Sequence, residues 1–319
     1  MFQIIKILIS MKKFRRWLLK LEVEILHLNT MMMYPYAVPA SRLGTKVIIH
    51  IREHWPPNEN VTQLNFARKV IKKYVEVVIA INETSKTLLG LPEKTEVVYD
   101  WIDFDGRDKF TDFKSIFGEN HNNLKVALFL GGIQNTKGAL QVVKAFHRKI
   151  EADNGRLLFV GCDSKEISYG GLKGTVKRIL NLFNYFTYSD QIKKIMQEDG
   201  RIECIPSTNQ VKSLFEQAYC TVIFPTIPHA IIPIAESIYL GTPVLSADTP
   251  EAREYSNQGE GAILFKMNDE TQFAEEFKSI YKSRVKQDRR AARNSKFVKR
   301  LFSKETNSRK VEEIYNRIL

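Results

Sequence analysis

Short apolar runs alternate with segments of helical periodicity along most of the chain. In the first third, the runs that predict strands cover residues 24–28, 46–51, 77–81 and 96–99. Later runs are cleaner and predict strands at residues 125–130, 157–160, 202–205, 221–224, 244–247 and 262–265. Because helical segments separate these runs, the pattern predicts an α/β protein whose parallel sheets carry helices on both faces.

The two groups of strands predict two domains. At 319 residues the chain is long enough for both, and its apolar fraction of 44% is ordinary for a globular protein. Residues 101–123 are polar and aromatic without clear periodicity. We predict a domain at residues 1–104, a linker at 105–123, a second domain at 124–300 and a terminal helix at 301–319. Ser303 is a suitable N-cap for that helix.

The three cysteines, Cys162, Cys204 and Cys220, are far apart and form no C-x-x-C pair. This usage predicts buried thiols in a reducing cytosol, and neither a zinc site nor a disulfide framework.

The net charge of +12 predicts attraction to an anion: nucleic acid, an acidic membrane face, or phosphorylated sugars and lipids. Much of the excess lies in residues 12–20 and 278–300. Neither stretch has an aromatic RNA-binding signature or zinc-finger spacing, so no nucleic-acid partner is predicted. The apolar segment 179–186, which follows several basic residues, either packs as an inserted helix or touches lipid.

The apolar run at residues 1–11 is too short to span a bilayer and lacks the features of a signal peptide. Together with the basic residues that follow, it predicts an amphipathic helix. That helix either lies on a membrane surface or packs against the first sheet. We therefore expect a cytoplasmic protein. The membrane-surface alternative would add peripheral contact with an anionic membrane.

The segment at residues 224–244 carries the clearest candidate chemistry. An apolar strand ends in a proline-rich loop, and a helix follows that opens near Pro233, carries Glu236 and stops at Gly241. Ligands of open α/β sheets bind beyond the carboxyl ends of the strands, where N–H groups at a helix start face an anion. We predict that this loop binds a nucleotide diphosphate through residues His229, Ala230, Ile231 and Ile232.

A second element precedes a helix at residues 128–138. Gly131 and Gly132 stand at a strand end, and Lys137 and Gly138 come just before the helix. Glycine lets a backbone approach a ligand closely and tolerates positive φ. Lys137 supplies a flexible point charge for a diphosphate.

Both elements resemble those of the retaining nucleotide-sugar glycosyltransferases of family 4. That family has two glutamates, the second eight residues after the first, and then Gly-Thr-Pro-Val. Glu236 matches the second acid, whereas Pro228 stands at the first. In the glycine element, Gly132 stands where the family has arginine. The resemblance implies that Glu236 holds the ribose of a UDP- or GDP-sugar. Since the first acid is missing, our hypothesis is that His229 accepts a hydrogen bond from the sugar in its place.

The strand end at residues 49–55 resembles the family's histidine and acid, with Arg52 at the histidine position and Glu53 at the acid. Arg52 would face the donor phosphate or the acceptor, and ion pairing at the rim is the alternative. A metal site at His50, Glu53 and His54 lacks the helical H-E-x-x-H spacing. We expect neither a metal nor a cofactor, since the nucleotide-sugar is a substrate.

The resemblance extends over nearly the whole chain and implies the GT-B fold, in which two Rossmann-like doubly wound domains face each other across a cleft. The first strands of that fold, with a glycine-rich loop, have no counterpart here, so we expect an incomplete first domain and an N-terminally truncated chain. The implied function is transfer of a sugar, with retention, to a glycan or lipid-linked acceptor in polysaccharide or O-antigen synthesis. The alternatives are a non-catalytic nucleotide-sugar-binding remnant or partner subunit and, third, a GT-B epimerase.

Overall fold

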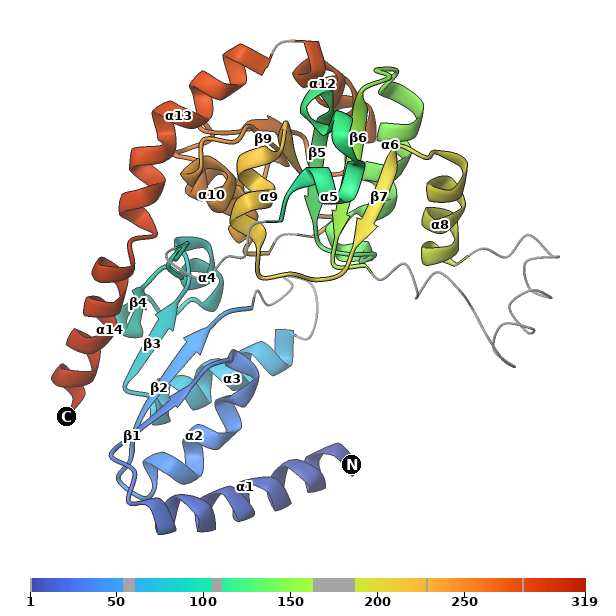
Figure 1. The fold of residues 1–319 in the computed structure, drawn as a ribbon. Helices are drawn as coiled ribbons and strands as arrows, with labels where there is room; N and C mark the ends of the chain where they lie inside the picture. Colours follow the sequence, from blue (N-terminus) through green and yellow to red (C-terminus); the bar gives the residue numbers. More distant parts are fainter. Residues whose placement is uncertain (1, 54–60, 105–110, 163–186, 228, 283) are drawn as a thin grey trace. The chain divides into compact units, whose positions relative to one another are not determined.

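The chain forms two units, each built on a parallel sheet of its own (Figure 1). The computed structural model describes residues 2–53, 61–104, 111–162, 187–227, 229–282 and 284–319. The first unit comprises Met1–Ile102 and Arg300–Leu319, and the second comprises Asp103–Lys299. His54, Pro228, the apolar segment 179–186 and the first part of the predicted linker lie outside the described residues.

The sheet of the first unit has four parallel strands in chain order: β1 (Ile25–Leu28), β2 (Lys46–Ile51), β3 (Val77–Ala80) and β4 (Thr95–Val97). Its helices and 3-10 turns are α1 (Phe2–Leu21), η1 (Met31–Met33), α2 (Tyr34–Ser41), α3 (Val61–Tyr74), α4 (Glu83–Leu89), η2 (Pro92–Lys94) and α14 (Lys304–Ile318). Val47 and Ile49 pack in one core with α2 and α3. Ile48 packs on the opposite face with Ile314 of α14. Burial on both faces explains why β2 reads as one continuous apolar run.

The sheet of the second unit has six parallel strands in the order β10-β9-β8-β5-β6-β7. These are β5 (Lys125–Leu130), β6 (Gly155–Val160), β7 (Ile202–Ile205), β8 (Cys220–Ile223), β9 (Val244–Ala247) and β10 (Ile263–Phe265). From β5 the chain adds strands on one side and then returns to add β8 on the other. The strand order therefore reverses between β5 and β8, which is where doubly wound sheets bind their ligands.

Helices cover both faces of this second sheet. The helices and turns of the unit are α5 (Phe113–Phe117), η3 (Glu119–Asn123), η4 (Asn135–Lys137), α6 (Ala139–Lys149), α8 (Tyr188–Glu198), α9 (Val211–Gln217), α10 (Ile232–Tyr239), α11 (Pro250–Tyr255), α12 (Glu270–Lys282) and α13 (Arg284–Leu301). Phe146 of α6 and Phe277 of α12 lie in the core on one face. Phe113 of α5 and Phe215 of α9 lie in the core on the other, so part of the segment predicted as linker packs within the second unit.

The sequence signals at helix ends agree with the structure. Ser303 caps α14, because its hydroxyl accepts a hydrogen bond from the N–H of Thr306 at 3.2 Å. Gly241 follows α10 with a φ of +80°, the left-handed conformation that glycine adopts at a helix end. Pro233 takes the second helical position of α10, one later than expected, and the first turn accommodates it because N–H groups there have no partner within the helix.

The prediction of three free thiols is wrong at two positions. The structure pairs Cys162 with Cys204 as a disulfide, with Cα atoms 5.9 Å apart, and leaves Cys220 as a buried thiol. The pairing follows from the register of the sheet, because Phe159 of β6 lies opposite Cys204 of β7. Cys162 comes just after the end of β6, so it lies beside the strand that carries Cys204. No described helix has the length and apolar character needed to cross a membrane.

Candidate functional site

The turn after β5 has a backbone that only glycine allows. The N–H groups of Gly131 and Gly132 donate to the carbonyl of Val160 at 3.3 and 3.0 Å, which ties the turn to the end of β6. Gly132 has a φ of +56°, and a Cβ there would lie 2.4 Å from the carbonyl oxygen of Gly161. The position at which the family carries an arginine therefore has no room for a side chain in this chain.

The turn before α6 approaches the loop after β8 just as closely. Gly138 has a φ of +70°, and a Cβ on it would lie 2.0 Å from the carbonyl oxygen of Phe224. Thr226 donates from its N–H to Thr136 and from its hydroxyl to Asn135, each at 3.1 Å. The two loops at the carboxyl ends of β5 and β8 thus form one assembly at the point where the strand order reverses.

Lys137 and His229 meet across these two loops. Lys137 Nζ lies 2.6 Å from His229 Nε2, and His229 Nδ1 lies 2.8 Å from the carbonyl oxygen of Ile227. Because a carbonyl only accepts, Nδ1 carries the proton and Nε2 of the neutral ring accepts from the ammonium group. Burial lowers the pKa of Lys137 below its ordinary value. The histidine thus holds the lysine ammonium group in place.

Glu236 lies on α10, which begins directly after the loop that carries His229. The helix packs on β8, where the hydroxyls of Ser237 and Thr221 lie 2.7 Å apart. Glu236 is half-buried, and burial raises the pKa of its carboxyl to about 7. Among the described residues its carboxyl has no hydrogen-bond or ion-pair partner. It is an acceptor available to hydroxyl groups of a ligand.

The remaining residues predicted in this loop lie at the start of α10. Ile231 is the N-cap and is buried, Ala230 precedes it, and Ile232 is the first helical residue. Backbone N–H groups at a helix start have no partner within the helix. Eight predicted residues, four between Gly131 and Gly138 and four from His229 to Ile232, therefore lie on two joined loops, with Glu236 on the helix that follows.

Arg52 and Glu53 lie in the first unit, and each is held by neighbours there. Arg52 forms an ion pair with Asp100 at 2.6 Å. The Glu53 carboxylate accepts from the hydroxyl of Thr30, from the N–H of Met31 at 3.1 Å and from that of Arg52 at 3.3 Å. These contacts fix the ends of β1 and β2 within the unit.

Two histidines that the sequence pattern does not connect lie side by side in the structure. The rings of His27 on β1 and His50 on β2 lie 5.6 Å apart, and His27 Nδ1 lies 2.6 Å from the hydroxyl of Tyr315. Burial, then Arg52 and His27, lower the pKa of His50 to about 4. The register of β1 and β2 sets His27 opposite Ile48, two residues before His50, so both rings lie on one face. Knowledge of that pairing would have revealed the cluster.

The described residues contain no group of three or more histidine, cysteine or acidic side chains able to hold a metal ion.

Comparison with known proteins identifies the family of this chain. The family model described as glycosyl transferases group 1 matches residues 111–297, more than half of the chain. The chain belongs to this family. A search of curated proteins gives no match for this group 1 transferase.

Solved structures show that the fold of this glycosyl transferase is GT-B-like. HepE of Anabaena, solved with UDP and glucose, has a TM-score of 0.76 at 16% identity, with 97% of this chain and 80% of HepE covered. Sucrose-phosphate synthase of Thermosynechococcus elongatus has a TM-score of 0.71 at 14% identity, covering 97% and 77%. A glycosyltransferase of Rickettsia africae has a TM-score of 0.73 at 17% identity, covering 98% and 81%. At these identities the likeness concerns the fold alone.

Proposed function

We propose that this glycosyltransferase moves a sugar from a nucleotide-diphosphate donor to a glycan or lipid-linked acceptor, with retention, in the synthesis of polysaccharide, O-antigen or another cell-envelope glycan. The observation that carries the donor half of the proposal is the junction of Lys137 and His229 at the reversal of strand order. It joins a cation, glycine turns and a helix start at one point, which suits a diphosphate.

The chemistry rests on stabilising the departing diphosphate. The bond between the anomeric carbon and the phosphate oxygen breaks, and the diphosphate leaves with the electron pair. Lys137 and the N–H groups at the start of α10 balance that charge. An acceptor hydroxyl then bonds to the anomeric carbon from the side of the leaving group, so its proton passes to the departing phosphate oxygen and the configuration is retained.

Glu236 and His229 have complementary parts in this proposal. The Glu236 carboxylate accepts from the ribose hydroxyls, and His229 holds Lys137 through Nε2. Since Nε2 is the one acceptor of the neutral ring, in this proposal it accepts from the donor sugar only once Lys137 has turned to the diphosphate. Arg52 and Glu53, each fixed at a strand end of the first unit, are our candidates for contact with substrate from that unit. HepE was solved with UDP and with UDP-glucose, so UDP is the first nucleotide to test and GDP the second. We place the reaction in the cytoplasm, at the inner face of the plasma membrane.

A nucleotide-binding protein without transferase activity is the second candidate. The observation in its favour is Gly132, where the backbone excludes the arginine that family members carry. Losing a charged hydrogen bond to the leaving group costs about 1.5–3 kcal/mol, which slows transfer without preventing binding.

Binding and turnover are tested separately. UDP at one hundred times its dissociation constant should raise the free energy of unfolding by about 2.7 kcal/mol if only the folded state binds. Lys137→Ala should remove that increase, whereas Lys149→Ala, at the other end of α6, should keep it. If neither UDP nor GDP stabilises the protein, or if Lys137→Ala keeps the full effect, the donor site is wrong. Release of nucleoside diphosphate from a donor panel with membrane extract then decides between the enzyme and the binding protein.

A further inference from the structure

Helix α1 has one face packed into the first unit. Leu18 lies in the core that α2 and α3 share, and Phe14 packs against that core, with its ring edge-on to the Tyr36 ring at 4.9 Å. The hydroxyls of Ser10 and Tyr36 lie 2.6 Å apart. These contacts fix which side of α1 faces away from the unit.

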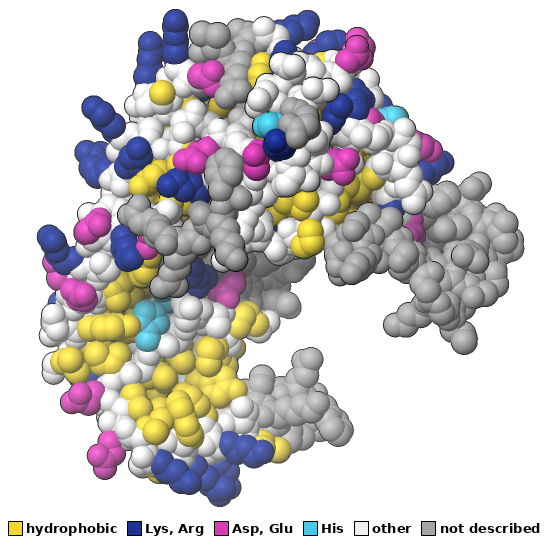
Figure 2. Space-filling view, viewed as in Figure 1, with side chains coloured by type: hydrophobic (Ala, Val, Ile, Leu, Met, Phe, Trp, Pro, Cys, Tyr) yellow, Lys and Arg dark blue, Asp and Glu magenta, His cyan; other side chains and the backbone are white. Residues whose placement is uncertain are grey.

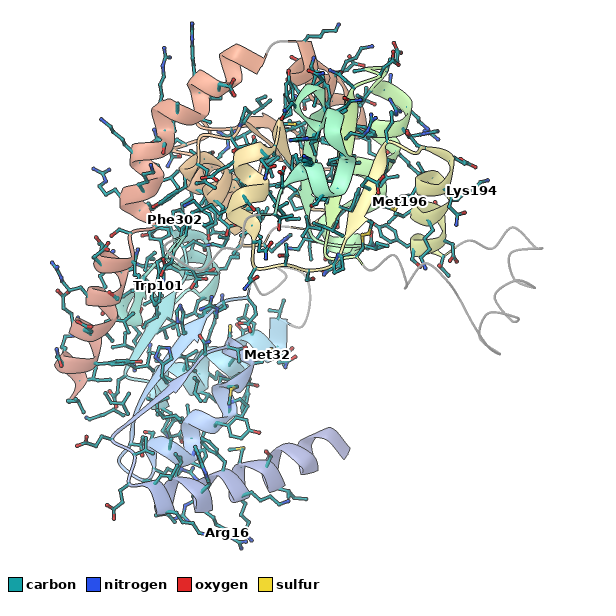
Figure 3. The ribbon with its side chains drawn as sticks, viewed as in Figure 1. Arg16, Met32, Trp101, Lys194, Met196 and Phe302 are labelled. Atoms are coloured by element: carbon teal, nitrogen blue, oxygen red, sulfur yellow. A yellow bond between two sulfur atoms is a disulfide. The ribbon has the colours of Figure 1, made fainter. Side chains whose placement is uncertain are left out.

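The outward side of α1 is strongly basic. At about 3.6 residues per turn, residues four apart line up along a helix, and Lys12, Arg16 and Lys20 form such a row opposite Phe14 and Leu18. All three are exposed, and Arg16 projects away from the unit (Figure 3). Residues 9–21 contain five cations and no acid. Among the described residues, none of the three has an ion-pair partner.

Large apolar side chains share this basic surface. Ile9 and Leu19 lie on the same side of the helix and are 52% and 55% exposed, and Trp17 at its margin is 51% exposed. Dark-blue cationic side chains gather where α1 lies in the space-filling view (Figure 2). Cations interleaved with aliphatic and indole side chains match the boundary between anionic headgroups and acyl chains.

Helix α13 provides an internal comparison. Arg289, Arg293 and Lys296 are exposed on its surface, but none of its described side chains is a large exposed apolar group. An anion attracted by charge alone, such as RNA, would find both helices suitable. A bilayer requires the apolar groups too, and these are present on α1.

We propose that the outward face of α1 docks this protein on an anionic membrane surface. Lys12, Arg16 and Lys20 contact lipid phosphates, while Ile9 and Leu19 enter the acyl boundary. The inference deepens the proposed function, because a lipid-linked acceptor lies at such a surface. Its test needs no sugar donor.

The test is flotation of the full chain with vesicles of phosphatidylcholine alone or with a third of phosphatidylglycerol. A cation near an anionic surface contributes roughly fivefold to partitioning, so the combined variant Lys12→Glu, Arg16→Glu and Lys20→Glu should bind at least about a hundredfold more weakly. The matched control, Arg289→Glu, Arg293→Glu and Lys296→Glu on α13, changes the net charge equally and should retain most of the binding.

Two further measurements separate docking from general charge attraction. Ile9→Ser with Leu19→Ser keeps every charge and should still weaken vesicle binding several-fold. The Trp17 emission, isolated by difference from Trp17→Phe, should shift to the blue with anionic vesicles. All of these variants, on α1 and on α13, should unfold like the parent. Each should also respond to UDP as the parent does, so that a failed donor site and a failed docking surface are distinguishable. The proposal would be overturned if the charge variants of α1 and α13 lost vesicle binding equally, or if the α1 charge variant bound vesicles as well as the parent. It would also be overturned if the parent bound RNA as well as it binds anionic vesicles.

Discussion

Replacing Glu236 with glutamine should make the protein more stable and weaken nucleotide binding. Burial raises the pKa of the Glu236 carboxyl from 4.5 to about 7, so the fold disfavours its charged form. Below pH 4.5 the carboxyl is protonated in both the folded and the unfolded state, and there is no penalty. As the pH rises to 7, the unfolded chain ionises first, and stability falls by at most about 3 kcal/mol, at 1.36 kcal/mol per pKa unit.

Glu236→Gln removes this penalty and should flatten the pH dependence. Near pH 4.5 the free energy of unfolding of the variant should equal that of the parent. Above pH 7 it should exceed that of the parent by up to about 3 kcal/mol, and solvent screening at the half-buried carboxyl reduces this difference. Urea unfolding of both proteins between pH 4.5 and 8.5 measures the difference. Glu216→Gln, at an exposed position on α9, is the matched control and should leave the stability curve unchanged.

Nucleotide binding should respond in the opposite direction. Ribose hydroxyls that donate to the carboxylate favour its charged form, and each such bond contributes about 1.5–3 kcal/mol, so the variant should bind UDP at least tenfold more weakly. At pH 7 about half of the parent molecules carry the Glu236 proton, so binding should release about half a proton. Calorimetry in buffers of different ionisation heat measures that release. A variant no more stable at pH 8 than the parent, or one that binds UDP equally well, would refute the reasoning.

Three other predictions follow from the described contacts. Burial, then Arg52 and His27, lower the pKa of His50 to about 4, so the contribution of this ring to stability falls by at most about 3 kcal/mol as the pH drops from 6.5 to 4, opposite in sign to that of Glu236; thermal unfolding should therefore show His50→Gln gaining stability relative to the parent over that pH range. His229→Ala should weaken UDP binding by roughly tenfold, the effect of one lost hydrogen bond to Lys137, whereas His229→Gln, which offers an oxygen acceptor, should restore most of it; equal losses in titrations of the two variants would contradict the pairing. Gly138→Ala should destabilise the protein by at least about 1 kcal/mol, because its positive φ and the nearby backbone leave no space for a methyl group, while Gly200→Ala, in open space, should not; chemical unfolding compares them.

The strands were predictable because buried parallel strands leave a strong trace in sequence. The runs at residues 46–51, 125–130, 202–205 and 244–247 coincide with β2, β5, β7 and β9. β2, β5 and β9 each bury at least three consecutive residues, as expected for strands covered on both faces, whereas β7 lies at the edge of its sheet and exposes Glu203. Fold class followed from the alternation of these runs with helices.

The lateral relations between strands were not predictable from local pattern. The contact between Cys162 and Cys204 depends on the register of β6 with β7, across a separation of 42 residues. The adjacency of His27 and His50 depends in the same way on β1 and β2. Sequence periodicity states which face of a strand is buried, but not which residue of another strand lies opposite.

The candidate site shows how far motif matching reaches. The sequence indicated Lys137 and His229 separately, and the structure adds that the histidine accepts from the lysine at 2.6 Å. At Gly132 the motif showed only a missing arginine, whereas the structure shows a positive φ and a carbonyl where a Cβ would lie. An arginine at position 132 would displace the turn after β5, which is hydrogen-bonded to the end of β6. Restoring the motif by a single substitution should therefore damage the site. Lys137, positioned by His229, therefore has to balance the diphosphate charge with backbone N–H groups as its partners.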